Sequence, residues 1–127
     1  MLVCGTGAGI LPMFLRKNFA NHLGSLVTVD INEQMLQVAE EFFGFDAKDP
    51  EGIIKSICDD AYSFIEGSQP EQFDAIFMDV NFEEDNIKIS PPTRFLEVAF
   101  LQKVVDLLKD YGYITINLLV EDKKDLD

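Results

Sequence analysis

The chain has 127 residues, which is a suitable length for one domain, and 47% of them are hydrophobic, which is enough to build a core. It carries 23 acidic and 10 basic residues, for a formal net charge of −13, so we expect no nucleic-acid ligand, because phosphates would be repelled. This charge favours a cationic partner, such as an amine or a basic protein, although acidity also fits a protein that is simply soluble.

No run of about eighteen or more apolar residues occurs, so we expect no membrane span. Met1 opens directly into an apolar run, with no basic segment or small-residue cleavage site, so we expect no signal peptide and a cytoplasmic protein. Cys4 and Cys58 both close apolar runs and are expected to be core thiols in a reducing compartment. The cysteines and the single histidine, His22, lack metal-ligand spacing, so no metal site is expected.

A glycine-rich turn comes first along the chain. The apolar run from Met1 to Cys4 stops at Gly5-Thr6-Gly7-Ala8-Gly9, and a segment with helical character follows from Ile10 to Phe19. A strand, a glycine turn and a helix in this order form a ligand cradle at the carboxyl end of a parallel strand. Glycine lets a ligand approach the backbone, and the helix N-terminus offers free N–H groups. Such a turn also occurs without a ligand, so it needs support elsewhere.

Asp30 gives that support. It closes the apolar run Leu26 to Val29, roughly twenty residues after the last glycine, where a carboxylate is typical of a partner for both hydroxyls of a ribose. The dinucleotide pattern would need a glycine at Ile10, so the third glycine comes one position early for it. The observed form fits adenosyl-sulfonium cofactors, which carry no pyrophosphate.

An amphipathic helix is predicted next, with Asn32 as its N-cap and Gly44 at its end. Its buried face is expected to hold four residues at helical spacing: Met35, Ala39, Phe42 and Phe43. The rest of the chain predicts strand 53–58, a short helix or turn at 62–65, strand 73–79, a polar loop at 80–92, a helix at 93–109 and strand 114–120. Core candidates of the last helix are Phe95, Ala99, Leu101, Val105 and Leu108.

Strands that alternate with helices predict an α/β fold with right-handed crossovers and a parallel sheet of order 3-2-1-4-5. The ligand is then expected beside the first strand, at the point where the strand order reverses. Asp30, Asp60 and Asp79 follow the ends of the second, third and fourth strands. These three carboxylates are therefore expected to line one edge of the sheet together with the glycine turn.

Together, the sequence motifs of this chain resemble those of the class I S-adenosylmethionine-dependent methyltransferases, in their spermidine-synthase-like branch. The resemblance rests on the glycine turn, Val29-Asp30-Ile31-Asn32, Asp60-Ala61-Tyr62-Ser63-Phe64-Ile65, Phe73-Asp74-Ala75-Ile76-Phe77-Met78-Asp79 and Ser90-Pro91-Pro92. Further phrases match the protein lysine and N-terminal methyltransferases of this branch: Phe42-Phe43-Gly44-Phe45, Asp79-Val80, Phe100-Leu101-Gln102-Lys103-Val104 and Asn117-Leu118. The resemblance covers nearly the whole chain, and it implies a Rossmann-like fold with S-adenosyl-L-methionine as cofactor.

The resemblance also implies roles for the site residues. The turn Gly5 to Gly9 would approach the methionine part and the ribose of the cofactor. Asp30 would hold the ribose hydroxyls, and Ile31 would pack on the adenine. Asp60 would accept a hydrogen bond from the adenine amino group, and the backbone N–H of Ala61 would donate one beside it.

Asp79 stands where the aminopropyltransferases of this branch hold the substrate amine. In a methyltransferase it would orient or deprotonate an amine nucleophile, and the alternative is a carboxylate that only caps a loop. Two departures count against aminopropyl transfer: Ala8 replaces an aspartate of the turn, and Glu83 comes one position late for a second acid. We therefore expect methylation of a protein amine, with aminopropyl transfer or a non-catalytic methyltransferase-like interaction module as alternatives.

Class I methyltransferase domains usually have more strands than this chain predicts. Residues 1–127 are therefore expected to form a single, partial S-adenosylmethionine-binding domain, truncated after the fifth strand. The fifth strand would then be an exposed edge, which a partner chain or a second copy is expected to cover.

Overall fold

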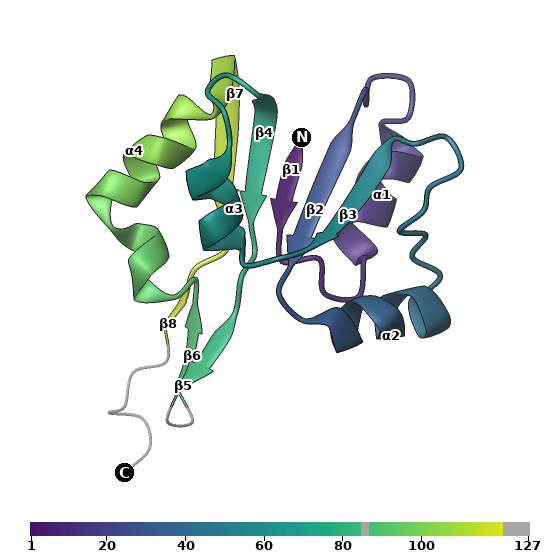
Figure 1. The fold of residues 1–127 in the computed structure, drawn as a ribbon, viewed down its shortest axis with the longest axis horizontal. Coiled ribbons are helices and arrows are strands. Elements are labelled where there is room, and N and C mark those ends of the chain that lie inside the picture. Colours follow the sequence, from purple (N-terminus) through teal and green to yellow (C-terminus); the bar gives the residue numbers. More distant parts are fainter. Residues whose placement is uncertain (85–86, 121–127) are drawn as a thin grey trace.

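The computed structural model describes residues 1–84 and 87–120 (Figure 1). Its centre is a five-stranded parallel sheet in the order β3-β2-β1-β4-β7, so the predicted α/β fold and strand order are confirmed. The strands are β1 (Leu2–Cys4), β2 (Leu26–Asp30), β3 (Ile54–Cys58), β4 (Phe73–Met78) and β7 (Leu108–Ile116).

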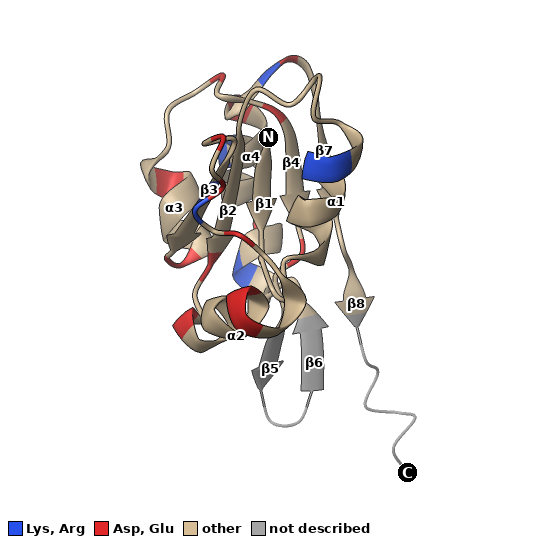
Figure 2. Cartoon of the chain, turned by 90° about the vertical axis from the view of Figure 1, so that its right-hand side faces the viewer, with Lys and Arg blue, Asp and Glu red and all other residues tan. Residues whose placement is uncertain are grey.

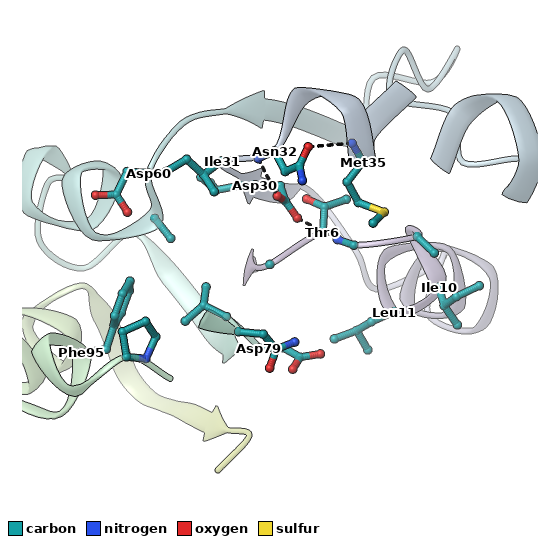
Figure 3. A pocket seen from close by; sticks show the side chains of 18 of the residues that line it. Thr6, Ile10, Leu11, Asp30, Ile31, Asn32, Met35, Asp60, Asp79 and Phe95 are labelled. Atoms are coloured by element: carbon teal, nitrogen blue, oxygen red, sulfur yellow. Dashed lines mark hydrogen bonds between the residues drawn. The ribbon is translucent and has the colours of Figure 1, made fainter. Parts of the chain in front are cut away.

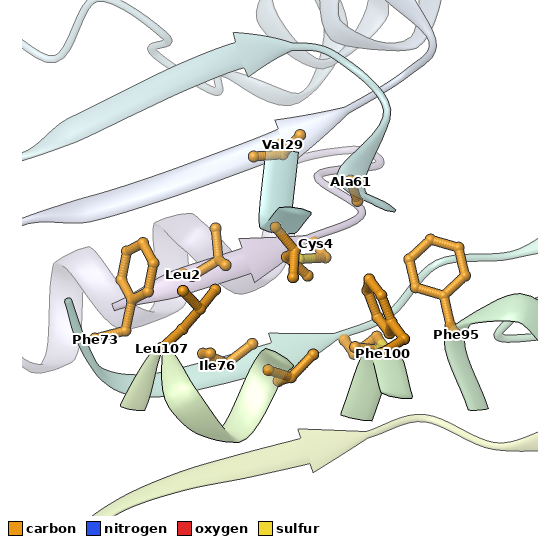
Figure 4. Close-up of a cluster of buried hydrophobic side chains, with 12 residues drawn as sticks. Leu2, Cys4, Val29, Ala61, Phe73, Ile76, Phe95, Phe100 and Leu107 are labelled. Atoms are coloured by element: carbon orange, nitrogen blue, oxygen red, sulfur yellow. The ribbon is translucent and has the colours of Figure 1, made fainter. Parts of the chain in front are cut away.

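Helices cover both faces of this sheet (Figure 1). One face carries α1 (Ile10–Asn18) and α2 (Glu33–Phe43), and the other carries α3 (Ala61–Gly67), the 3-10 helix η1 (Thr93–Leu96) and α4 (Val98–Asp106). Successive side chains of a strand point to opposite faces, so Leu2 and Cys4 join one core cluster and Val3 the other. Figure 4 shows the first cluster, in which the rings of Phe95 and Phe100 pack beside the sheet.

The predicted caps of α2 are confirmed, but its predicted buried face is wrong. Asn32 Oδ1 accepts a 3.0 Å hydrogen bond from the N–H of Met35, and Gly44 ends the helix with φ 72°. Ala39 is the only buried residue of α2, whereas Phe42 is 70% exposed. The 3.6-residue period identifies an apolar stripe, but how much of it is covered depends on how the helix sits on the sheet.

A hairpin replaces the polar loop predicted at 80–92. β5 (Phe82–Glu84) pairs antiparallel with β6 (Ile87–Ser90), and β6 pairs with β8 (Leu119–Val120) to form a second, three-stranded sheet. The sequence at 87–90 alternates apolar and polar residues, which is the period of a strand. Its partner β8 comes from much later in the chain, so this pairing was not predicted.

The single helix predicted at 93–109 is also wrong. The chain is extended at Glu97, with φ −64° and ψ 137°, and this residue separates η1 from α4. The break changes the phase of the helix, so Phe100 and Val104 are buried while the expected core residues Ala99 and Val105 are exposed. A helical phase counted from Phe95 therefore does not carry over into α4.

The fifth strand also departs from its predicted span of 114–120. β7 begins at Leu108, and its register with β4 shifts between Phe73 and Ala75. Tyr111 lies in this irregular part with a φ of 65° and is fully exposed. Among the described residues, β7 pairs only with β4, so it is an edge strand.

Two further expectations concern the cysteines and the membrane. Cys4 is buried, as expected, but Cys58 is exposed at the end of β3, because that strand forms the other edge of the sheet. In the part of the chain that the structure describes, no helix has the length and apolar character needed to cross a membrane.

Candidate functional site

A cavity of about 860 Å³ lies at the carboxyl ends of the parallel strands (Figure 3). The predicted site residues that line it are Gly5, Thr6, Gly7, Ala8, Asp30, Ile31, Asp60, Ala61 and Asp79. Figure 3 shows Asp60 and Phe95 at one end, Ile10, Leu11 and Met35 at the other, and Asp30 and Asp79 between them. The remaining predicted residue, Gly9, does not line the cavity.

The three glycines of the turn serve different purposes. Gly5 has a φ of 89°, and a Cβ there would lie 2.0 Å from the carbonyl oxygen of Asp79, so only glycine lets the end of β4 approach the turn. Gly9 has a φ of 77°, and its Cβ would lie 2.6 Å from the ring of Phe45, so Gly9 serves packing. Gly7 has a φ of 50° and open space around its Cβ position.

Asp30 fastens the turn to the neighbouring strand. Its Oδ2 accepts a 2.9 Å hydrogen bond from the N–H of Gly7, and its Oδ1 accepts one of 2.9 Å from the N–H of Asn32. Because each carboxylate oxygen has two lone pairs, both oxygens retain capacity for a further donor. Asp30 thus shapes the turn and can still receive two hydroxyls from the cavity.

The hydroxyl of Thr6 is the unsatisfied polar group of the site. Thr6 is only 4% exposed, and its Oγ1 has no hydrogen-bond partner among the described residues. Burying a hydroxyl without a partner is unfavourable, so a polar ligand group in the cavity would stabilise this arrangement. From the sequence, Thr6 was predicted only as a member of the turn.

Asp79 is held by groups from several strands. Its N–H donates to the carbonyl of Cys4 at 2.8 Å, and its Oδ1 accepts from Asn117 Nδ2 at 2.8 Å. The N–H of Asn117 donates to the carbonyl of Met78 at 2.9 Å, and the buried Ser90 hydroxyl lies 3.0 Å from the carbonyl of Asn117. Asn117 was not predicted as a site residue, although a polar residue that follows an apolar strand is a usable signal.

Asp60 is the N-cap of α3 and has an additional partner that was not predicted. Its Oδ1 accepts from the N–H of Tyr62 and its Oδ2 from the hydroxyl of Ser63, both at 3.2 Å. Arg94 Nη2 also donates to Oδ1, at 2.9 Å. Arg94 comes from η1, which the sequence predicted as part of a continuous helix, so its position beside Asp60 was not apparent.

The cavity is bordered by exposed apolar side chains. Ile10 and Phe14 of α1, Ile31 after β2 and Met35 of α2 all line it and are exposed. Ile31 is 70% exposed, so its apolar side chain is accessible to a ligand in the cavity.

Two curated proteins are similar to this chain in sequence. No family model matches the chain. The eEF1A lysine and N-terminal methyltransferase of Homo sapiens is 34% identical over 125 residues, which cover 96% of this chain and 18% of that protein. The same protein of Mus musculus is 32% identical over 123 residues, which cover 96% of this chain and 17% of that protein.

Two solved structures are also similar to this chain. Human methyltransferase-like protein 13 in complex with SAH matches with a TM-score of 0.82 and 31% identity, over 98% of this chain and 56% of that chain. Spermidine synthase from Thermotoga maritima matches with a TM-score of 0.65 and 16% identity, over 89% of this chain and 35% of that chain. At this low identity, the second match shows a likeness of fold alone.

The sheet order and the glycine turn at its carboxyl edge define a class I methyltransferase fold of the spermidine-synthase-like type. This confirms the resemblance seen in the sequence. The chain is a homologue of the eEF1A lysine and N-terminal methyltransferase. It spans only 17% and 18% of the length of the mouse and human relatives.

Proposed function

We propose that this chain is an S-adenosyl-L-methionine-dependent methyltransferase that modifies an amine of a protein, either a lysine side chain or an N-terminus. The observation that carries the proposal is the convergence of the glycine turn, Asp30 and Asp79 on one cavity. The homologous relative, named as a lysine and N-terminal methyltransferase, and the SAH complex of a similar structure support it.

The residues present fit this cofactor. The free lone pairs of Asp30 suit the two ribose hydroxyls, and the unpartnered hydroxyl of Thr6 suits a polar group close to the turn. The open space at Gly7 leaves room for a ligand against the backbone. Ile31 would cover the adenine, and the carboxylate of Asp60 would accept from its amino group.

S-adenosylmethionine would supply an electrophilic methyl group on a sulfonium. The chain's own part is to position an amine for in-line attack and to take up the proton that the amine loses. We assign both tasks to Asp79, which is half-buried and lines the cavity. Acidic residues on α2, drawn in red in Figure 2, contribute to the net charge of −13, and this charge favours a cationic acceptor.

The test has two stages. Calorimetry with S-adenosylhomocysteine measures cofactor binding, and then labelled methyl groups are followed into eEF1A, the acceptor in the relative's name, and into a lysate. Asp79→Asn is the matched variant, which we expect to bind the cofactor and to lose methyl transfer. Binding without any transfer would leave a non-catalytic module, and the absence of heat at millimolar ligand would contradict the proposal altogether.

A parallel assay separates aminopropyl transfer. The chain is given the decarboxylated cofactor with putrescine, and the thioether by-product is measured. We expect none, because Ala8 lines the cavity where the aminopropyltransferases carry an aspartate that holds an amine.

For partners and location, we propose that a partner chain or a second copy covers the edge strand β7 and that the protein acts in the cytoplasm. Tyr111 and Tyr113 of β7 are exposed, and Tyr113 packs edge-on against Phe77 with ring centroids 6.2 Å apart. An uncovered edge of this kind pairs readily with another chain. Light scattering across a concentration series tests self-association, and imaging of a tagged chain tests location.

A further inference from the structure

We infer that Arg94 is a positioning residue of the cofactor site, which holds the Asp60 carboxylate in the orientation that reads the amino group of adenine. The inference rests on the proposed function, since it requires an adenosyl cofactor in the cavity. It assigns a task to the only basic side chain among the residues found to line that cavity.

Arg94 is itself held in place by two rings. Its guanidinium carbon lies 4.9 Å from the ring centroid of Tyr62 and 5.2 Å from that of Phe95. These rings belong to the aromatic cluster between α3 and α4, in which Tyr62 stacks on Phe100 with centroids 4.3 Å apart. The two rings therefore restrict the position of the guanidinium beside Asp60, although half of the Arg94 side chain is exposed.

The hydrogen bonds of Asp60 leave one acceptor position free. Among the described residues, Oδ1 receives the N–H of Tyr62 and Arg94 Nη2, and Oδ2 receives only the hydroxyl of Ser63. Since each oxygen accepts about two bonds, the remaining position is on Oδ2. Ala61 is the first residue of α3, and its N–H has no acceptor among the described residues. This acceptor beside a donor is complementary to adenine, whose amino group donates a hydrogen bond and whose N1 accepts one.

Arg94 makes the shortest of the three hydrogen bonds to this carboxylate, at 2.9 Å against 3.2 Å for the other two. Without Arg94, Asp60 keeps only its two longer bonds and can turn away from the cavity. A group held before binding loses less freedom when the ligand arrives, so removal of Arg94 should weaken adenine recognition. An exposed ion pair of this kind supports a change of about two- to five-fold in affinity.

The experiment compares S-adenosylhomocysteine with S-inosylhomocysteine, in which an oxygen replaces the amino group of the base. Calorimetry on the whole chain measures both affinities for the unchanged protein, Arg94→Ala, Arg94→Gln and Asp60→Ala. We expect Arg94→Ala to lower the affinity for S-adenosylhomocysteine by about two- to five-fold. The variant should also show a smaller preference for S-adenosylhomocysteine over the inosine compound. Arg94→Gln, which keeps an N–H donor, should restore part of that preference.

Two controls separate this role from general stability. Lys109→Ala removes a comparable exposed ion pair, 3.0 Å from Asp74 and outside the cavity lining, and should leave both affinities unchanged. In the Asp60→Ala background, Arg94→Ala should have no further effect, because Arg94 acts through Asp60. Thermal unfolding of each variant shows that the binding data come from folded protein.

Each outcome has a distinct meaning. An unchanged or increased preference for adenine in Arg94→Ala would overturn the inference while leaving the proposed function intact. So would an equal effect of Arg94→Ala with and without Asp60. No binding of S-adenosylhomocysteine by the unchanged protein would contradict the proposed function, and the inference with it.

Discussion

The side-chain amide of Asn117 donates a 2.8 Å hydrogen bond to Oδ1 of Asp79 and thereby joins the residues that follow β7 and β4. Asn117 is itself fixed by its backbone N–H, which donates to Met78, and by the hydroxyl of Ser90, which lies 3.0 Å from its carbonyl. Asp79 Oδ1 thus has one hydrogen-bond partner, and no partner of Oδ2 is found among the described residues. The two strand ends act together on one carboxylate.

Asn117→Ala should therefore lower methyl transfer without a matching loss of cofactor binding. We expect the turnover rate at saturating cofactor to fall by about tenfold, which corresponds to one hydrogen bond to a charged group. Asn117→Asp keeps the shape but places one carboxylate against another, so it should lose at least as much. Initial rates and calorimetry with S-adenosylhomocysteine are measured together. An affinity loss as large as the rate loss would mean that Asn117 supports the whole cavity and not Asp79 alone.

Asp30→Ala should lower the affinity for S-adenosylhomocysteine by roughly ten- to a hundred-fold, because it removes charge-assisted hydrogen bonds of about 1.5–3 kcal/mol to the ribose. It also removes the acceptors for Gly7 and Asn32, so the unfolding temperature should fall as well. Asp30→Asn keeps one acceptor oxygen and should lose less. Binding and thermal unfolding are compared at fixed ionic strength. Unchanged affinity in Asp30→Ala would mean that the cofactor is not held through its ribose at this residue.

The glycines of the turn should differ in their tolerance of a side chain. Gly7→Ala should reduce the free energy of unfolding by about 1–2 kcal/mol, the cost of a left-handed residue in open space. Gly5→Ala should reduce it further, because its Cβ would meet the carbonyl of Asp79 and force β4 away. Urea unfolding of both variants gives the comparison. Equal losses would show that the close approach of β4 to Gly5 is not required.

The two thiols should react very differently in the folded protein. Burial raises the pKa of the Cys4 thiol to about 12, so almost no thiolate exists at pH 8. Cys58 is exposed, so an alkylating reagent at pH 8 should modify Cys58 alone until denaturant is added. Mass spectrometry of the two peptides reports the sites. Modification of Cys4 at a similar rate in the native protein would mean that β1 is accessible.

The first half of the fold could be predicted because its signals are local. A strand that stops at glycines, a carboxylate that closes the next strand and the caps at Asn32 and Gly44 all depend on residues close together in the chain. Asp30, Asp60 and Asp79 reach one cavity for a related reason, since the ends of parallel strands meet at one edge of the sheet. Their binding roles stay predictions until a ligand is measured.

The sequence by itself thus determined the sheet order, the glycine turn and the row of carboxylates. Tertiary structure decided the rest, because contacts between distant segments selected among locally similar alternatives. The extended residue Glu97 changed which face of α4 is buried, and β8 turned the expected loop into part of a second sheet. Arg94 and Asn117 reach Asp60 and Asp79 only because the folded chain brings η1 and the end of β7 beside them. The hydrophobic period and the motif spacing of a single sequence do not show which distant residues come into contact.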